Sequence, residues 1–454
     1  MSVVSINPAT ETEIERFEPH DANGVEAALA TAEVAFKGWR LTDLATRAGI
    51  LMDTARLLEA RKPQLAAHMT AEMGKPLAEA EAEIDKCAWV CRHYADTAER
   101  DLADTPVQTD ARQAYIRHLP LGPILAVMPW NYPFWQVFRF AAPALMAGNV
   151  GLLKHASNVW RCALDIEDVL RDAGLPDGCF QTLLIGAGQV DAVIRDRRVR
   201  GVTLTGSGPA GAAVAASAGA AIKPSVLELG GTDAFLVMPS ADLETAVEAA
   251  VAARMKNTGQ SCIAAKRFFV HRQVYDRFRE AFVARVEGLL PGDPMDRHTA
   301  LGPLALQKIR DTLSDQVEAS LAAGARRLNR TAALPDRGWY FGPQILENAP
   351  QTSPAATAEL FGPVAALWPV ESLDDAIARA NASEFGLGST LFSQDPREIE
   401  QAVRDLEAGS TFINAPVSSD PRLPFGGIKD SGYGRELAAD GLLAFTNRKT
   451  VSLA

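Results

Sequence analysis

Short apolar segments alternate with helical segments between Ile124 and Gly211, and this alternation restricts the fold more than any other feature of the chain. Four segments have the length and apolar content of buried strands: ILAVMP (124–129), VGLLKH (150–155), TLLIG (182–186) and RGVTLTG (200–206). A helix is expected after Asn131, and another from about Val159 to Ala173. Strands and helices that alternate at this spacing form βαβ units, so the segment predicts a parallel sheet.

The same alternation returns in the second half of the chain, from Gly231 to about Pro369. There we expect strands at Ala234–Met238 and Arg267–Val270, with a helix at Leu243–Lys256 between them. The segment 19–104 instead spaces its apolar residues as helices do. A chain of 454 residues has room for two or three domains, and these patterns predict two α/β domains.

Composition and charge exclude several classes of function. The chain has 45 basic and 56 acidic residues, a net charge of −11, which repels phosphate backbones and argues against a nucleic-acid partner. No apolar run reaches the roughly 18 residues that span a bilayer, and the first residues lack the features of a secretory signal. We therefore expect a cytoplasmic protein with no membrane partner.

The five cysteines also point to a reducing compartment, since an odd and sparse set does not build a disulfide framework. Cys87 and Cys91 lie one helical turn apart, which is the spacing of half a metal site. No second pair of Cys or His residues completes that site, so both are predicted to be packing residues and no metal is expected.

A glycine-rich loop, Gly206–Gly211, has the pattern G-x-G-x-x-G between an expected strand and an Ala-rich helix. In this context small residues let backbone amides approach a pyrophosphate at the start of a helix. A tight strand–helix turn would have the same pattern. Glu228 follows Gly206 by 22 residues, as the ribose-binding acid of this motif does, but VLELGG (226–231) could equally present a catalytic base. Spacing alone leaves both interpretations open.

Cys262 ends the polar turn NTGQSC (257–262), where nearby backbone donors favour thiolate character. A nucleophilic thiol also needs an oxyanion donor and a base. Asn131, within PWNYP (129–133), is the candidate amide donor, and Glu228 is the candidate base.

These residues belong to a set of seven motifs by which the chain resembles the NAD(P)-dependent aldehyde dehydrogenase superfamily along nearly its whole length. The motifs stand in family order: PWNYP (129–133), LLK (152–154), TGS (205–207), LELGG (227–231), NTGQSC (257–262), ELFGPV (359–364) and PFGGIKDSGYGRE (424–436). The compact length, LKHASN and AAKRF look most like bacterial succinate-semialdehyde dehydrogenases.

The resemblance implies an aldehyde dehydrogenase-like α/β fold with three parts. Residues 1–105 and 122–230 would form a Rossmann-type cofactor-binding domain, and 231–425 the catalytic domain. Residues 106–121 and 436–454 would form a small β element for oligomerisation, with a strand at Ala114–His118 beside Val451–Leu453. Such strands leave open edges in a monomer, so a homo-oligomer, dimer or tetramer, is expected.

The same resemblance assigns the chemistry. Cys262 would attack the aldehyde carbonyl, while the Asn131 side chain and the Cys262 backbone N–H hold the oxyanion. Hydride would pass to the nicotinamide and leave a thioester, which water activated by Glu228 would hydrolyse. This assignment favours Glu228 as the base over a ribose-binding role.

Cofactor residues follow from the resemblance as well: Trp130, Lys154, Ser157, Gly206, Ser207, Glu359 and Phe361. Glu359 would hold the nicotinamide ribose, and Ser207 with the Gly206 loop the pyrophosphate. NAD-using relatives commonly carry Glu at the position of Ser157, where a carboxylate would repel a 2′-phosphate. We therefore predict that NADP is used at least as well as NAD, with His155 leaving some ambiguity of charge.

Arg139 and Trp135 are the main candidates for substrate binding. They follow Asn131 by eight and four residues, so in a helix the three would share one face, with Arg139 roughly 12 Å from Asn131. In succinate-semialdehyde dehydrogenases an Arg at this place binds the distal carboxylate. Lys256 and Ser419, with Ser418, would add polar groups, and Tyr132 would narrow the tunnel. Asp420 and Arg422 have no interpretation from the sequence.

The expected substrate is a short semialdehyde acid, succinate semialdehyde first and glutarate semialdehyde next. Several alternatives remain. An uncharged or cationic aldehyde would leave Arg139 turned away, and a CoA-acylating relative would not need Glu228. A non-catalytic protein on this fold would not need Cys262, and a plain cysteine hydrolase would bind no cofactor.

Overall fold

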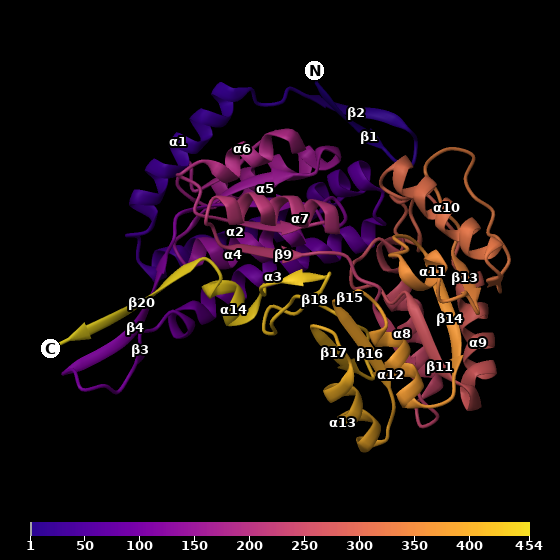
Figure 1. Ribbon diagram of the computed structural model, residues 1–454. Helices are drawn as coiled ribbons and strands as arrows, with labels where there is room; N and C mark the ends of the chain where they lie inside the picture. Colours follow the sequence, from indigo (N-terminus) through magenta and orange to yellow (C-terminus); the bar gives the residue numbers. More distant parts are fainter. Residues whose placement is uncertain (1) are drawn as a thin grey trace.

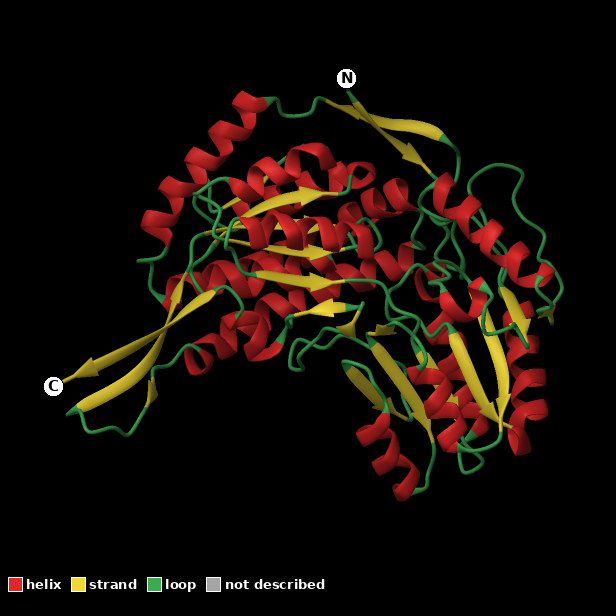
Figure 2. Ribbon diagram, in the orientation of Figure 1, coloured by secondary structure: helices red, strands yellow, loops and turns green. Residues whose placement is uncertain are grey.

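Two large β-sheets, one in each half of the chain, organise the computed structural model, which describes residues 2–454 (Figures 1 and 2). The helices are α1 (Ala22–Trp39), α2 (Leu44–Met73), α3 (Leu77–Asp101), α4 (Trp135–Met146), α5 (Trp160–Asp172), α6 (Val190–Arg195), α7 (Gly208–Ala220), α8 (Leu243–Met255), α9 (Arg272–Glu287), α10 (Gln307–Ala322), α11 (Pro354–Thr357), α12 (Leu373–Asn381), α13 (Pro396–Asp405) and α14 (Ala438–Leu443). Three 3₁₀ helices join them, η1 (Ser157–Val159), η2 (Ala187–Gln189) and η3 (Lys256–Gly259). This is the aldehyde dehydrogenase-like α/β fold that the motifs predicted.

The first large sheet has the strand order β19-β9-β8-β5-β6-β7. Its strands are β5 (Pro123–Met128), β6 (Val150–His155), β7 (Phe180–Thr182), β8 (Gly201–Thr205), β9 (Ser225–Glu228) and β19 (Gly432–Tyr433). All neighbours are parallel except β19 and β9. The chain runs outward from β5 to β7 and returns on the other side of β5 as β8. The carboxyl ends of β5 and β8 therefore flank the point where the strand order reverses, which is where such sheets bind ligands.

One predicted strand of this sheet is wrong. The segment TLLIG (182–186) was expected to be a strand, but β7 ends at Thr182. Leu183 still donates its N–H to the Leu153 carbonyl at 2.7 Å, and a turn then places the Ile185 N–H 2.8 Å from the Leu183 carbonyl. Leu183 and Ile185 are apolar because they are fully buried, not because they continue the sheet.

The second large sheet has the order β12-β13-β14-β11-β10-β16-β17 and is parallel except for β12 and β13. Its strands are β10 (Ala234–Val237), β11 (Arg267–His271), β12 (Arg326–Arg327), β13 (Gln344–Glu347), β14 (Val364–Val370), β16 (Gly388–Phe392) and β17 (Ser410–Ile413). Alternate residues of β10 enter different cores: Ala234 and Leu236 pack on one face, Phe235 and Val237 on the other. Both faces are thus buried, as a largely parallel sheet requires.

A smaller three-stranded sheet, in the order β20-β4-β3, projects from the body and carries the C terminus at its tip (Figure 1). It contains β3 (Thr105–Pro106), β4 (Gln113–Pro120) and β20 (Thr446–Leu453). The antiparallel pairing of β4 with β20 places Tyr115 opposite Val451. The pairing of Ala114–His118 with Val451–Leu453 is therefore confirmed, over a longer range than predicted.

The functional division into residues 1–105 and 122–230, 231–425, and 106–121 with 436–454 stays a prediction. Two further short pairings were not foreseen, the hairpin β1 (Val3–Asn7) with β2 (Thr12–Phe17) and the pair β15 (Phe385–Gly386) with β18 (Ile428–Lys429). Within residues 2–454 no helix combines the length and apolar character needed to cross a membrane.

The first large sheet and its helices share one core, in which Cys87 and Cys91 of α3 are fully buried. This confirms that both are packing residues. Among residues 2–454, no group of three His, Cys, Asp or Glu side chains is arranged to hold a metal ion.

Candidate active site

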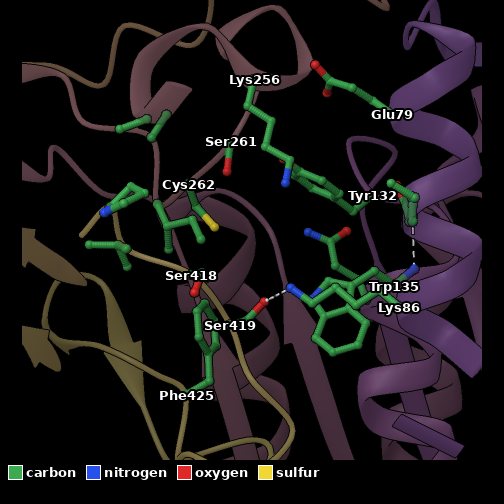
Figure 3. A pocket seen from close by; sticks show the side chains of 18 of the residues that line it. Glu79, Lys86, Tyr132, Trp135, Lys256, Ser261, Cys262, Ser418, Ser419 and Phe425 are labelled. Carbon is green, nitrogen blue, oxygen red and sulfur yellow. Dashed lines mark hydrogen bonds between the residues drawn. The ribbon is translucent and has the colours of Figure 1, made fainter. Parts of the chain in front are cut away.

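A cavity of about 230 Å³ lies where α3, α4, the loop around Cys262 and the segment 416–419 meet. Its lining comprises Glu79, Ala82, Glu83, Lys86, Tyr132, Trp135, Gln136, Arg139, Ala252, Ala253, Lys256, Ser261, Cys262, Ile263, Ala264, Pro416, Val417, Ser418, Ser419 and Phe425. Figure 3 shows the labelled side chains converging on this space. Four segments far apart in sequence thus supply one cavity with a thiol, hydroxyls and several cations.

Cys262 is half-buried in the lining, after the 3₁₀ helix η3. Two residues of η3, Asn257 and Thr258, have φ values of 53° and 52°, so the backbone that precedes the thiol is tightly wound. Burial raises the pKa of the Cys262 thiol to about 12, against the opposing pull of the Arg139 cation. The expected thiolate character is therefore absent from this state, because the surrounding protein removes water more effectively than it supplies positive charge.

Asn131 lies in the turn between β5 and α4 and is 4% exposed. Its Nδ2 donates to the Gln260 carbonyl at 3.1 Å, and its Oδ1 accepts from Nε2 of Gln136 at 3.0 Å. The Asn257 amide in turn donates to the Asn131 carbonyl at 2.8 Å. These contacts fasten the turn to the loop of Cys262. Because an amide carries two N–H groups, one remains for a ligand oxygen.

The three residues 131, 135 and 139 do not form one continuous helical face, contrary to the prediction. The helix α4 begins at Trp135, and Asn131 precedes it in the turn. The roughly 12 Å separation estimated from helical rise therefore does not apply. Trp135 and Arg139 do lie on the same face of α4, and both line the cavity.

Arg139 is buried and forms an ion pair with Glu436 through its Nε. Its NH2 group donates to Oγ1 of Thr205 at 3.2 Å, and its guanidinium lies 4.5 Å from the centre of the Phe425 ring. The candidate anchor for a substrate carboxylate thus already has a carboxylate partner within the protein.

Glu228 lies at the end of β9, beside this ion pair and outside the cavity lining. Neither carboxyl oxygen has a hydrogen-bond partner among residues 2–454. Burial, and then the carboxyl group of Glu436, raise the pKa of Glu228 well above its usual range, while Arg139 acts in the opposite direction. A Cβ at Gly426 would stand 2.6 Å from Glu228 Oε1, so the glycine makes room for the carboxyl group.

The remaining substrate candidates occupy the cavity rim. Lys256 is exposed and Ser419 is buried, while Ser418 is exposed. Lys86, which sequence reasoning missed, donates from Nζ to Ser419 Oγ at 2.7 Å. Its signal was the spacing of Glu79, Glu83 and Lys86, which places three charges on one face of a helix.

Four aromatic or charged residues near the rim have structural partners. Phe134 is fully buried in the core, whereas Tyr132 lines the cavity with the Lys75 ammonium 3.8 Å from its ring centre. Asp420 and Arg422 form an ion pair with each other at 2.6 Å, and the Arg422 side chain is 68% exposed. The two residues without an interpretation therefore neutralise each other at the surface.

The loop after β8 fits a phosphate group. Ser207 precedes α7, and the first N–H groups of any helix lack partners within it. No atom lies within 4 Å of a Cβ placed at Gly208, so that space is open. Only Gly211 of the three motif glycines is sterically required, because its Cβ would meet Leu229 at 2.6 Å.

Lys154 and Ser157 stand at the carboxyl end of β6, next to β5. Ser157 is exposed and Lys154 is half-buried, with no ion pair among residues 2–454. An unpaired ammonium and a free hydroxyl at this edge fit a ribose or its phosphate. His155 between them is buried, and burial lowers its pKa to about 4, so it is neutral.

Three further cofactor candidates gather on the Cys262 side of this edge. Trp130 and Phe361 pack edge to face, with ring centres 5.7 Å apart. Glu359 accepts from the Gly231 N–H at 3.2 Å and lies 3.4 Å from Lys266, which also donates to the Cys262 carbonyl at 2.8 Å. Glu359, which was expected to hold the nicotinamide ribose, is therefore linked through Lys266 to the loop of the thiol.

Known proteins resemble this chain along its whole length. A sequence model of the aldehyde dehydrogenase family matches residues 1–451. The chain is 51% identical over 463 residues to succinate-semialdehyde dehydrogenase (NADP+) 1 of Mycobacterium tuberculosis, covering 100% of both proteins. It is 52% identical over 458 residues to succinate-semialdehyde dehydrogenase (NADP+) of Mycobacterium leprae, again with 100% coverage of both.

Solved structures extend the likeness to the fold. The succinic semialdehyde dehydrogenase of Streptococcus pyogenes, in complex with NADP+, superposes with a TM-score of 0.97 at 38% identity, over 99% of each chain.

Proposed function

The chain belongs to the aldehyde dehydrogenase family and is an NAD(P)-dependent aldehyde dehydrogenase, and on that premise we propose that it oxidises succinate semialdehyde to succinate. The observation that carries the proposal is a small cavity that contains one thiol, Cys262, together with the cations Lys86, Arg139 and Lys256. A short aldehyde whose far end is a carboxylate matches both ends of that cavity. The names of the mycobacterial relatives support the same substrate.

We assign the covalent step to Cys262. Its sulfur attacks the aldehyde carbon, and the second N–H of the Asn131 amide with the Cys262 backbone N–H stabilises the oxygen as it becomes negative. The thiol must first give its proton to a base, since burial raises its pKa, and Glu228 in its ionised form is the candidate acceptor. A nicotinamide cofactor, when bound, accepts hydride from the resulting tetrahedral carbon.

Glu228 is proposed as the base that activates water against the acyl group on Cys262, once its buried carboxyl group has ionised. Its carboxyl group now lies against Gly426 and outside the cavity, so this role requires the side chain to turn toward Cys262. The absence of any hydrogen bond to its two oxygens, within residues 2–454, leaves it free to turn. This base distinguishes the proposal from a CoA-acylating reaction, in which a thiol and not water takes the acyl group.

We further propose NADP as the preferred cofactor. Lys154 and Ser157 would hold the adenosine ribose and its phosphate, and Gly206 with Ser207 the pyrophosphate. Glu359, Trp130 and Phe361 would hold the nicotinamide end. The open space at Gly208 and the unpaired Lys154 support this placement.

Initial rates of NADPH and NADH formation from succinate semialdehyde, compared with butanal, test the function. Butanal has the same carbon count without the charge, so a cationic cavity should favour the acid by at least tenfold in kcat/KM. Equal rates would instead indicate an aldehyde dehydrogenase that acts on uncharged aldehydes. The ion pair between Arg139 and Glu436 is consistent with that alternative, because it occupies the candidate carboxylate anchor.

A further inference from the structure

The guanidinium of Arg139 already has a carboxylate partner inside the protein. It forms an ion pair with Glu436, contacts Thr205 and stacks on the Phe425 ring. A substrate carboxylate would have to compete with Glu436 for it, beside the further carboxyl group of Glu228. A cation without a carboxylate partner would attract the substrate more strongly.

Lys86 is such a cation. It projects from α3 into the cavity, where its Nζ donates to Ser419 Oγ at 2.7 Å and lies 4.3 Å from the centre of the Trp135 ring. No ion pair joins it to a carboxylate among residues 2–454. Glu83, a carboxylate of its own helix that acts on it, is engaged with Lys75 and with the N–H groups of Phe134 and Trp135 at 2.9 Å. Asp420 also acts on Lys86 but is paired with Arg422.

The contact with Ser419 prepares a second donor. Because the Ser419 oxygen accepts from Lys86, its own hydrogen is free to point into the cavity. Ser419 is only 7% exposed, so the hydroxyl has little water to satisfy it. In Figure 3 the Lys86 and Lys256 side chains point into the same space as the Cys262 sulfur.

We propose that Lys86, with the Ser419 hydroxyl beside it and Lys256 across the cavity, binds the distal carboxylate of the substrate and selects acidic aldehydes. This inference rests on the proposed function and names the residue that determines its substrate class. Two charge-assisted hydrogen bonds would replace the water that a carboxylate loses on entry. An uncharged aldehyde makes no such contacts and leaves a partly buried ammonium unpaired, so the site discriminates against it.

Burial, helped by the Lys256 and Arg139 cations, lowers the pKa of Lys86 to about 8, while Cys87 and Glu83 act in the opposite direction. A bound carboxylate would raise that pKa and keep Lys86 charged. An ammonium with this environment gains more from an anionic partner than a fully solvated lysine would.

The test compares Lys86→Met and Lys86→Arg with wild type on succinate semialdehyde and butanal. Lys86→Met keeps most of the length of the side chain without its charge. We expect KM for succinate semialdehyde to rise at least tenfold, with kcat/KM for butanal within twofold of wild type. Lys86→Arg should retain part of the preference. Lys308→Met, on the exposed face of α10, is the matched control and should leave kcat/KM for both substrates unchanged.

Binding of the product, succinate, tests the same carboxylate site without oxidation of succinate semialdehyde. Succinate should inhibit butanal oxidation competitively, and Lys86→Met should raise its inhibition constant at least tenfold. If wild type shows no preference for the acid, the proposed function itself fails. If wild type prefers the acid and Lys86→Met still does, the inference alone is overturned. An equal loss on both aldehydes would also overturn it, since Lys86 would then support only the packing of Trp135 and Ser419.

Discussion

Glu228 carries an unusual combination of burial, missing hydrogen bonds and a neighbouring acid, and its titration should affect stability. Because burial and Glu436 raise its pKa in the folded protein, folding favours the protonated form. Stability is then lost as pH rises from the unfolded value, near 4.5, toward the raised folded value.

At pH 8 the free energy of unfolding of Glu228→Gln should therefore exceed that of wild type by at least about 1 kcal/mol, so the variant unfolds at a higher denaturant concentration. The difference in free energy should be smaller at pH 5. The same variant should form NADPH in a single burst and then stop, because the acyl group on Cys262 is not hydrolysed. Urea titrations at both pH values and a rapid-mixing assay measure the two effects. Equal stabilities at pH 8 would contradict the raised pKa.

Ser157 should decide between the two cofactors. A carboxylate in place of its exposed hydroxyl would repel a 2′-phosphate and could accept a hydrogen bond from a 2′-hydroxyl. Ser157→Glu is expected to lower kcat/KM for NADP at least tenfold and to spare or improve the value for NAD. Ser157→Gln, similar in size but uncharged, separates charge from bulk. An unchanged ratio between the cofactors would exclude Ser157 from the phosphate site.

Single residues were predictable from the sequence where a short motif contains the whole constraint. Asn131 and Cys262 were predicted as site residues in this way, and the structure ties their loops together through Asn257. Their chemical roles stay predictions. Lys86 was not found, because its role depends on which face of a long helix meets the cavity. The protonated state of Cys262 was also missed, since burial is a property of the folded chain and not of the turn around the thiol.

At the scale of elements, the turn between β5 and α4 depends on a buried histidine. His155 at the end of β6 has Nδ1 3.2 Å from the Met128 carbonyl oxygen and Nε2 2.9 Å from the Pro133 carbonyl oxygen. A neutral ring carries one hydrogen, and the shorter contact assigns it to Nε2, which donates to Pro133. This neutral ring fixes the turn that presents Asn131. It also resolves the ambiguity of charge that the sequence left at this position.

His155→Ala would leave the Pro133 carbonyl without its imidazole partner in a buried site, while the Ala156 N–H keeps the Met128 carbonyl. We expect a loss of about 2–3 kcal/mol in the free energy of unfolding, measured in urea, and a lower kcat because Asn131 is less well placed. His155→Gln offers an acceptor and a donor and should recover part of both. A fully stable His155→Ala would show that the turn does not need the ring.

The elements themselves were predictable where apolar periodicity and sheet pairing agree. VGLLKH became β6 with the expected bounds, and Arg267–Val270 became most of β11. The strand predicted at TLLIG was wrong because an apolar run is equally compatible with a buried loop. The hairpin of β1 and β2 gave little signal, since only two of its eleven side chains are buried and several are charged.

At the scale of the whole molecule, the cavity exists only because distant parts of the chain meet. Helix α3, the turn after β5, the loop of Cys262 and the segment 416–419 each supply part of its wall. The alternation of strands and helices predicts the two sheets, but no local pattern predicts how they face each other. This is why the thiol and the family motifs were predictable while the cation beside Ser419 was not.

The projecting sheet also has consequences for the whole molecule. Strand β20 pairs with β4 along one side, and its other edge has no partner among residues 2–454. Unpaired strand edges attract further strands, and cyclic pairing of identical chains satisfies them symmetrically. We therefore expect sedimentation velocity to show an even-numbered homo-oligomer.

Truncation after Lys449 removes the last five residues, 450–454, and should weaken association at least tenfold. Glu13→Ala, on the exposed hairpin strand β2, should leave association unchanged. A monomeric wild type, or a truncated chain that associates as strongly, would show that this edge is not the interface.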